Sequence, residues 1–188
     1  MPDLEFRLIS AITRCLPPIK GAGTLANALA HFYLRRPRAV IEEINDGIRF
    51  ELAPGESVNQ TGLLFFPRLL DRAEHRFITR TLKRGGVFVD IGSHVGSFTL
   101  PAARLVGEDG RVLAVEAFPQ TYARLARNLE LNDLNNIVAY NLGVSDKSET
   151  LKLGMKRGNS GAHSFLRPDH HSVDVGCLTL LAIINKAG

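Results

Sequence analysis

The chain has 188 residues, of which 45% are hydrophobic and 22% are charged. This composition suits one main domain with a sizeable core, and it excludes a disordered or low-complexity chain. The formal net charge is +4, and the basic residues are scattered, so they are interpreted as solvated surface. The alternative is a binding patch at the densest basic groups, Arg35-Arg36-Pro37-Arg38 and Lys83-Arg84.

The cysteines and the N-terminus indicate a compartment. Cys15 and Cys177 lie far apart in no metal-ligand spacing, which favours a reduced, intracellular protein. Charged residues interrupt the first apolar positions, so no signal peptide is predicted. No apolar run approaches the roughly 20 residues that span a bilayer. The expectation is a cytoplasmic protein without a transmembrane segment.

Two helices are predicted before residue 38. The first covers residues 4–16 and is ended by two prolines. The second runs from 24 to about 35 with Thr24 as its N-cap. They could cover the main sheet, lie on a membrane surface or bind substrate, and covering the sheet is favoured. The predicted inward face of the first helix consists of Leu4, Leu8, Ile9, Ile12 and Leu16.

The next segment is predicted to lead the chain into the main sheet. Alternating apolar residues around Asn45-Asp46-Gly47 predict a β-hairpin over 39–52. Asp71 is expected to cap a helix that ends at Gly85. The apolar residues of this helix are Ala73, Phe77, Ile78 and Leu82.

The stretch from Val87 to Leu100 is the centre of the chain. Its first five residues predict a buried parallel strand, and a glycine turn and a helical period follow. Backbone N–H groups at such a helix N-terminus face an anionic ligand. A dinucleotide-binding G-x-G-x-x-G starting at Gly92 would need glycine at 94 and 97, where histidine and serine stand. The turn suits the amino-acid part of S-adenosylmethionine, with Asp90 on its ammonium or ribose side.

The second predicted strand, 111–116, ends in a carboxylate. Glu116 lies 20 residues after Gly96, close to the offset of about 20 at which ribose-binding acids occur. A carboxylate accepts two hydroxyl hydrogen bonds at once, which matches a vicinal diol. Ala117 and Phe118 are placed to pack on adenine.

A third strand over 137–142 completes an α/β, right-handed doubly wound unit. Its ligand is expected at the carboxyl ends of the strands, near Gly92, Glu116 and Asn141–Gly143. The predicted division of the chain is a helical segment over 1–37, a hairpin and helix over 38–84, and a core domain over 85–188.

Four sequence blocks resemble the FkbM-type S-adenosylmethionine-dependent methyltransferases of the class I superfamily. This resemblance implies a Rossmann-like fold, S-adenosylmethionine as cofactor, and methyl transfer to a hydroxyl, often of a sugar or secondary metabolite. The blocks are 88–99 (FVDIGSHVGSFT), 110–116 (GRVLAVE), 127–132 (RNLELN) and 141–146 (NLGVSD). The implied cofactor contacts, with His94 in the same turn, are Asp90, Gly92, Ser93, His94, Gly96, Glu116, Ala117, Phe118 and Asn141.

Three features depart from that family pattern. Pro101 stands in a helix, but it is tolerated if the helix starts near Ser97, because the missing N–H then has no intrahelical partner. Leu181 stands where the family tends to have aspartate. The chain ends at Gly188, before an Asp-Val-Glu-Gly strand, so only the N-terminal half of the sheet is expected, with one edge of strand 87–91 unpaired.

The leading hypothesis is methylation of a small-molecule or glycan hydroxyl, with no nucleic-acid partner expected. The alternatives are a catalytically inactive remnant that still binds S-adenosylmethionine, and a nucleic-acid methyltransferase. No catalytic base is identified. His94 is interpreted as a backbone-positioning residue with an exposed ring, or else as an acid–base group. No metal is expected, because the histidines between strands 149–155 and 172–180 lack a coherent ligand set.

Overall fold

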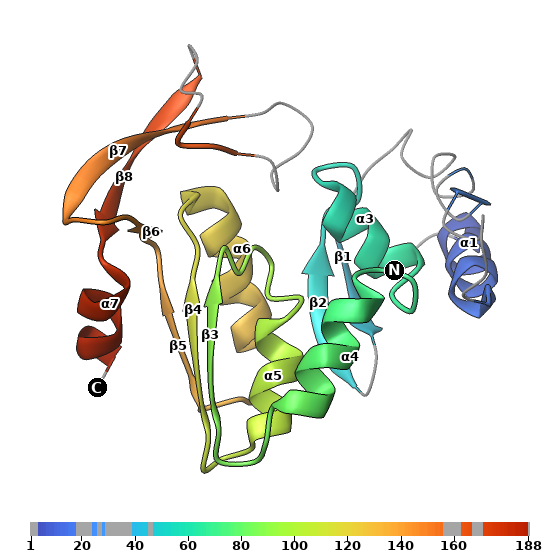
Figure 1. The fold of residues 1–188 in the computed structure, drawn as a ribbon. Helices are drawn as coiled ribbons and strands as arrows, with labels where there is room; N and C mark the ends of the chain where they lie inside the picture. The colour runs from blue at the N-terminus through green and yellow to red at the C-terminus, as the bar shows by residue number, and fades with distance from the viewer. Residues whose placement is uncertain are drawn as a thin grey trace. The chain divides into compact units, whose positions relative to one another are not determined.

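The computed structural model describes residues 4–17, 24–25, 28, 39–44, 47–155, 163–166 and 171–187 (Figure 1). The chain forms two compact units, Met1–Glu74 and His75–Gly188. The division into three segments stays a prediction. Within the described part, no helix is both long and apolar enough to cross a membrane.

The first unit is built from two helices and a hairpin. Strand β1 pairs antiparallel with β2, with Val40 opposite Leu52 and Ile44 opposite Ile48. This confirms the hairpin expected around Gly47. The elements are α1 (Leu4–Cys15), β1 (Val40–Ile44), β2 (Ile48–Leu52) and α3 (Val58–Phe65).

Helix α1 forms as expected but buries a different face. Phe6 is 1% exposed and its ring packs edge-on against Phe65 at 5.8 Å, whereas Leu4 is 83% and Leu8 is 61% exposed. The predicted inward face is therefore wrong, because the helix is oriented with Phe6, rather than Leu4 and Leu8, toward the interior. The second predicted helix lies outside the described residues except for positions 24, 25 and 28.

Helix α3 was not expected from the sequence. The Ser57 hydroxyl accepts a hydrogen bond from the Gln60 backbone N–H at 3.0 Å, which caps its first turn. The Gln60 side chain accepts from the Ala53 N–H at 2.8 Å. These contacts hold a segment whose Gly62 and β-branched residues weaken its own helical propensity.

The second unit contains the parallel sheet that the sequence predicts. Its strands lie in the order β3-β4-β5, with Asp90 opposite Ala114 and Val115 opposite Tyr140. Helices α5 and α6 lie on one side of this sheet (Figure 1). The fold is therefore the expected α/β, Rossmann-like methyltransferase type. Its elements are α4 (Arg72–Thr81, begun in the first unit), β3 (Val87–Ile91), α5 (Thr99–Val106), β4 (Arg111–Val115), α6 (Pro119–Glu130) and β5 (Ile137–Tyr140).

Strand β4 carries the core of this unit on both faces. Val112 packs with the α5 residues Ala102, Ala103 and Val106 in one buried cluster. Leu113 and Val115, on the other face, pack with Ile183. Alternate residues of a strand point to opposite faces, so a strand that is apolar throughout belongs in the middle of a sheet.

Strand β3 is an edge strand within the described residues. It pairs with β4 on one side, and no described strand pairs with it on the other. Val87 is 68% and Ile91 is 52% exposed. An edge without a regular strand partner was expected here. The prediction of a strand buried on both faces is wrong, because only Asp90 of its five residues is buried at this sheet edge.

Helix α5 tolerates Pro101, as expected, but begins later than Ser97. Phe98 is its N-cap and Thr99 its first residue. The Leu100 N–H donates to the Gly96 carbonyl at 3.1 Å and the Ala102 N–H to the Phe98 carbonyl at 2.9 Å, so the helix continues across the proline. Pro101 lies in the first turn, where proline is accepted.

A second small sheet follows β5, with the order β6-β8-β7. Its strands β7 and β8 are antiparallel, which confirms the pair expected there. Helix α7, which the sequence did not predict, lies on the opposite side of the main sheet from α5 and α6 (Figure 1). The elements are β6 (Gly143–Val144), β7 (Glu149–Gly154), β8 (Ser172–Leu178) and α7 (Leu180–Ala187).

Candidate functional site

The glycine turn after β3 is held by the end of the neighbouring strand. The N–H groups of Gly92 and Ser93 both donate to the Val115 carbonyl, at 2.8 and 3.1 Å. The Gly96 N–H donates to the Ser93 carbonyl at 2.8 Å. The turn is therefore fixed beside the carboxyl end of β4, as expected for a ligand site in an open parallel sheet.

Two glycines of the turn have left-handed backbone angles that other residues rarely adopt. Gly96 has a φ of +93°, and a Cβ there would lie 3.0 Å from Leu125 Cδ1. Gly92 has a φ of +78°, and a Cβ there would meet nothing within 4 Å. Gly96 is therefore required for close packing of α6, whereas Gly92 leaves open space beside the turn.

Asp90 ties the turn to α5. Its carboxylate is 9% exposed and accepts a hydrogen bond from the Thr99 hydroxyl. Burial raises the pKa of Asp90, and the hydrogen bonds from Thr99 oppose that rise. The predicted contact with the ammonium or ribose of a ligand stays a prediction, and the geometry gives this side chain a positioning role at the start of α5.

Glu116 bridges the two loops that form the site. Its Oε2 accepts from the His94 N–H and its Oε1 from the Phe118 N–H, both at 2.9 Å. Burial raises the pKa of Glu116, the backbone hydrogen bonds lower it, and the Asp90 charge raises it further. An ionised carboxylate has about four lone-pair positions, so the backbone hydrogen bonds leave capacity for a ligand hydroxyl.

A cavity of about 290 Å³ opens at this point. Four of the predicted residues line it, namely Gly92, His94, Glu116 and Ala117. The cavity lies at the carboxyl ends of β3 and β4, where the sequence placed it. Leu142 and Gly143, from the segment expected near the ligand, also line the cavity. The rest of the wall was not predicted and consists of Ile91, Val115, Val144, Leu153, His163 and Phe165.

Two other predicted residues lie beside the cavity rather than in its lining. Phe118 packs with the cluster of Leu153 and Cys177, and its ring meets that of His163 edge-on at 4.3 Å. The Asn141 amide donates to the carbonyls of Glu116 at 2.8 Å and Ala117 at 3.1 Å. Asn141 therefore holds the chain segment that follows β4.

His94 is half-buried, and its ring is not exposed as one interpretation expected. Its φ of +51° is unusual for a residue with a side chain. Burial lowers the pKa of His94 to about 4, and the positive charges of His163 and Arg124 act in the same direction. The imidazole is therefore neutral near pH 7.

Asn128 is a buried residue of α6 that supports the turn and that sequence reasoning missed. Its amide donates to the Val95 carbonyl at 2.8 Å, and the residue is 0% exposed. A polar residue one position after an arginine on an amphipathic helix gives no signal of this tertiary contact.

S-adenosylmethionine fits the donor groups at this site. The Ser93 hydroxyl is buried without a hydrogen-bond partner among the described residues, and Gly92 leaves open space at the cavity. The Ser93 hydroxyl and the Glu116 carboxylate complement a carboxylate and a ribose diol, respectively. Among the described residues, no group of three or more histidine, cysteine, aspartate or glutamate side chains is placed to hold a metal ion.

A family model matches the central part of the chain. It is the TRM5/TYW2 methyltransferase domain, and it matches residues 46–164. That range contains the glycine turn, the Glu116 bridge and Asn141.

Curated relatives match shorter segments. A 23S rRNA (uracil(1939)-C(5))-methyltransferase of Psychrobacter arcticus is 44% identical over 31% of this chain and 12% of its own length. A probable cobalt-precorrin-6B C(15)-methyltransferase of Sulfolobus acidocaldarius is 42% identical over 28% of each chain. A tRNA (guanine(37)-N(1))-methyltransferase of Anopheles darlingi is 36% identical over 43% of this chain and 15% of its own. The chain thus spans less than a third of the length of these relatives.

The solved structure of TYW2 from M. jannaschii in complex with AdoMet aligns with 55% of this chain and 43% of its own. The TM-score is 0.40 at 23% identity.

These matches bear on two expectations from the sequence, the absence of a nucleic-acid partner and the family resemblance. The expectation of no nucleic-acid partner is wrong, since two of the relatives are rRNA and tRNA methyltransferases. The resemblance to methyltransferases is confirmed at the level of the domain, but the matching family is not the FkbM type.

Replacing Asn128 is expected to destabilise the turn. Asn128→Ala leaves the buried Val95 carbonyl without its donor, which lowers the free energy of unfolding by about 1–3 kcal/mol. Arg127→Ala, at an exposed neighbour on the same helix, changes it by about 0.5 kcal/mol or less. Urea denaturation measures both, and equal effects of the two substitutions would contradict the role assigned to Asn128.

The neutral state of His94 predicts a pH dependence of stability. Between pH 6.5 and about 4 the unfolded chain binds a proton at this histidine that the folded chain does not. The free energy of unfolding therefore decreases as the pH falls through this window. Asn tolerates left-handed backbone angles and does not titrate. His94→Asn is therefore expected to become more stable relative to the wild type as pH falls through that window. A stability difference independent of pH in thermal unfolding would refute this.

Proposed function

The chain belongs to the TRM5/TYW2 methyltransferase domain family, and from that membership we propose that it transfers a methyl group from S-adenosylmethionine to RNA. One observation carries the proposal. The range matched by the family model includes every residue predicted to contact the cofactor, from Asp90 to Asn141.

S-adenosylmethionine is the methyl donor of this class of domain, and its sulfonium supplies an already activated methyl group. Within this chain, the glycine turn and Ser93 bind the amino-acid part, and Glu116 accepts hydrogen bonds from the ribose hydroxyls. Ala117 and Leu142 supply apolar contact in the cavity. The chain thus orients the donor for transfer of its methyl group.

His94 is available to a ligand as a neutral imidazole. It lines the cavity, and burial keeps it uncharged near pH 7. A neutral imidazole accepts a hydrogen bond or a proton, while a charged one would repel the sulfonium. The side chain is thus suited to a cavity that holds a cation.

RNA is favoured over a small acceptor because two relatives with 44% and 36% identity act on rRNA and tRNA. A small-molecule acceptor is the second candidate, supported by the cobalt-precorrin relative. The hydroxyl chemistry implied by the FkbM resemblance belongs to that second candidate. A remnant that binds the donor without turnover is the third outcome that the experiments below distinguish.

Donor binding is expected to depend on Glu116. S-adenosylhomocysteine at about 100 times its Kd stabilises the wild type by about 2.7 kcal/mol. Glu116→Gln removes the negative acceptor and reduces that ligand-induced shift, whereas Glu130→Gln on the exposed end of α6 leaves it unchanged. Because each shift is measured against the same variant without ligand, a loss of intrinsic stability does not mimic a loss of binding. An equal shift in both variants would exclude this ribose contact.

Methyl transfer to RNA is expected from the protein with labelled S-adenosylmethionine. Total tRNA or rRNA becomes labelled, and ribonuclease treatment releases the label. Label that appears only in a small-molecule fraction would favour the second candidate. Donor binding without any transfer would identify the chain as a non-catalytic remnant.

A further inference from the structure

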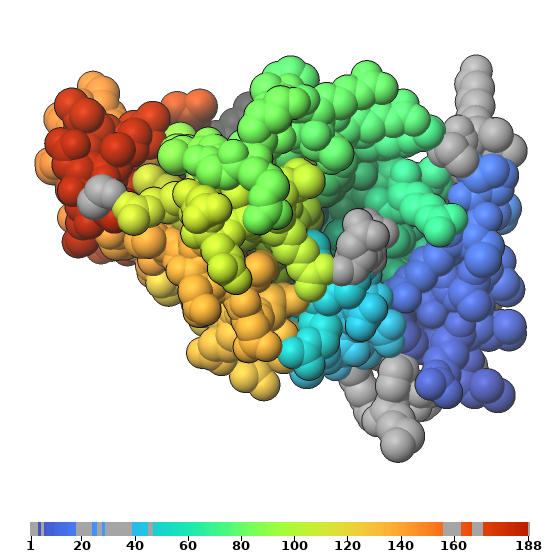
Figure 2. Space-filling model, turned by 90° about the horizontal axis from the view of Figure 1, so that it is seen from below, coloured from blue at the N-terminus to red at the C-terminus, as the bar shows by residue number. Residues whose placement is uncertain are grey.

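The outward face of α4 carries a group of exposed basic residues and an exposed aromatic ring. Arg76, Arg80 and Lys83 are exposed and follow one another at intervals of four and three residues, so they lie along one side of the helix and the turn that follows it. Phe77 is 69% exposed beside them. These four residues are called the α4 basic face. The segment of the chain that includes α4, coloured green, lies on the surface visible in Figure 2.

The inner side of α4 is fixed by packing, so the basic face has a defined orientation. The His75 ring lies 4.7 Å from the ring of Phe98. Leu82 packs against the buried cluster of α5 and β4, and Ile78 is half-buried. Of the apolar residues that the sequence showed on this helix, Phe77 does not belong to the inner side. The inward residues instead recur at 75, 78 and 82, which turns Phe77 toward solvent.

The cations of this face lack the acidic partners that other basic residues of the unit have. Arg127 pairs with Glu130 at 3.1 Å, Lys152 with Asp174 at 3.1 Å, and Lys147 with Glu149 at 3.5 Å. Among the described residues, no ion pair involves Arg76, Arg80 or Lys83.

The charge on the α4 basic face is therefore uncompensated by acids on its own helix. The nearest acid on the helix, Glu74, is two residues before Arg76 and six before Arg80, and neither spacing brings side chains together on a helix. The face therefore presents three positive charges to solvent, a pattern that complements a polyanion.

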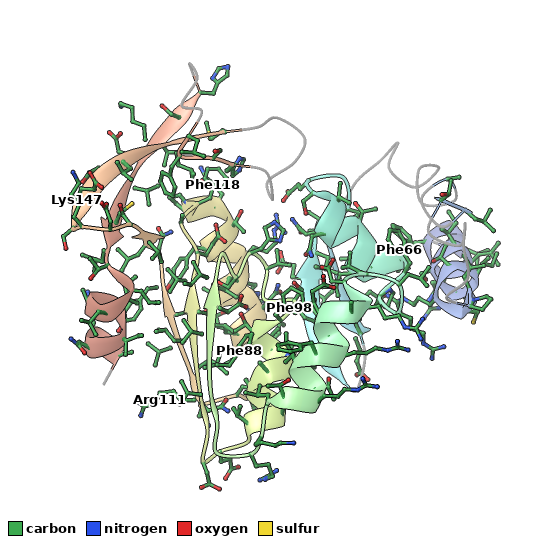
Figure 3. All side chains as sticks on the ribbon, in the orientation of Figure 1. Phe66, Phe88, Phe98, Arg111, Phe118 and Lys147 are labelled. Carbon is green, nitrogen blue, oxygen red and sulfur yellow. The ribbon has the colours of Figure 1, made fainter. Side chains whose placement is uncertain are left out.

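The α4 basic face is also connected to the candidate donor site. Phe98, which the His75 ring contacts, is the N-cap of α5 and lies two residues after Gly96 (Figure 3). Helix α4 is thus packed against the segment that carries the glycine turn. A polyanion bound on this face would lie on a helix that contacts the segment carrying the glycine turn.

We propose that the α4 basic face binds a single-stranded segment of the RNA substrate, with the three cations on phosphates and the Phe77 ring stacked on a base. This inference rests on the proposed function and names the surface that the acceptor uses. Exposed aromatic rings among cations are typical of single-strand binding, because every base has a face on which a ring can stack. An anionic membrane is the alternative partner, since cations beside an exposed aromatic ring also suit a membrane surface, and the vesicle measurement below distinguishes it from RNA.

The test compares two variants that lose the same charge. The variant R76Q/R80Q/K83Q removes the face, and R127Q/K147Q/K152Q removes three exposed basic residues that have acidic partners. Binding of a labelled single-stranded RNA is measured by fluorescence anisotropy at several salt concentrations. Each phosphate contact on a single strand contributes about 0.7 to the slope of log K against log salt. The first variant is expected to lose about 2 from that slope, and the second to keep it.

Phe77 provides a measurement that does not depend on charge. Phe77→Ala is expected to weaken RNA binding by about tenfold without changing the salt slope, and Phe77→Tyr to retain binding. Both triple variants should keep the stabilisation by S-adenosylhomocysteine, which shows that the fold and donor site are intact.

Three results would overturn the inference. If the wild type binds and methylates RNA and both triple variants keep its salt slope, the surface is wrong while the proposed function stands. If the wild type neither binds nor methylates RNA, the proposed function fails and the inference fails with it. If the first variant loses binding only to vesicles that contain phosphatidylserine, the partner of this face is a membrane.

Discussion

The hydrogen bonds of the Glu116 carboxylate are the interactions on which the site depends. One oxygen accepts from the His94 N–H and the other from the Phe118 N–H, so a single side chain joins the glycine turn to the loop after β4. Removing that carboxylate would leave two buried N–H groups without a partner. The same group that shapes the cavity is therefore the one that offers its remaining lone pairs to a ligand.

Two carboxyl groups, those of Asp90 and Glu116, lie at the site and are held by hydrogen bonds. Asp90 and Glu116 are both buried, and burial raises the pKa of each. Their charges are stabilised by hydrogen bonds from backbone N–H groups and from Thr99 rather than by a neighbouring cation. Of the two carboxyls only Glu116 lines the cavity, beside the neutral His94.

The sequence predicted those parts of the fold in which local pattern and tertiary structure agree. One such part is the strand at 87–91 with its glycine turn at 92–96 and the carboxylate at the end of β4. Their spacing in the sequence was enough to predict their relative positions at the carboxyl ends of the strands. The Asn-Asp-Gly turn fixed the hairpin in the same way.

The parts that the sequence did not predict depend on contacts between distant segments. Helix α3 is held by the hydrogen bond between Gln60 and Ala53. The orientation of α1 is set by the packing of Phe6 on Phe65. His163 and Phe165 reach the cavity only because β7 and β8 pair. The α4 basic face was missed for a related reason, since Arg76 and Arg80 look scattered in the sequence until the helix places them on one side with Lys83.

A binding measurement on the ribose contact tests the central claim most directly. Calorimetry compares S-adenosylhomocysteine with its 2′-deoxy analogue on the wild type and on Glu116→Gln. A hydrogen bond to a charged acceptor contributes roughly 1.5–3 kcal/mol, so the wild type is expected to bind the deoxy analogue at least about tenfold more weakly. In the variant that difference should nearly vanish. An undiminished loss of affinity in Glu116→Gln would contradict the assignment of Glu116 to the donor.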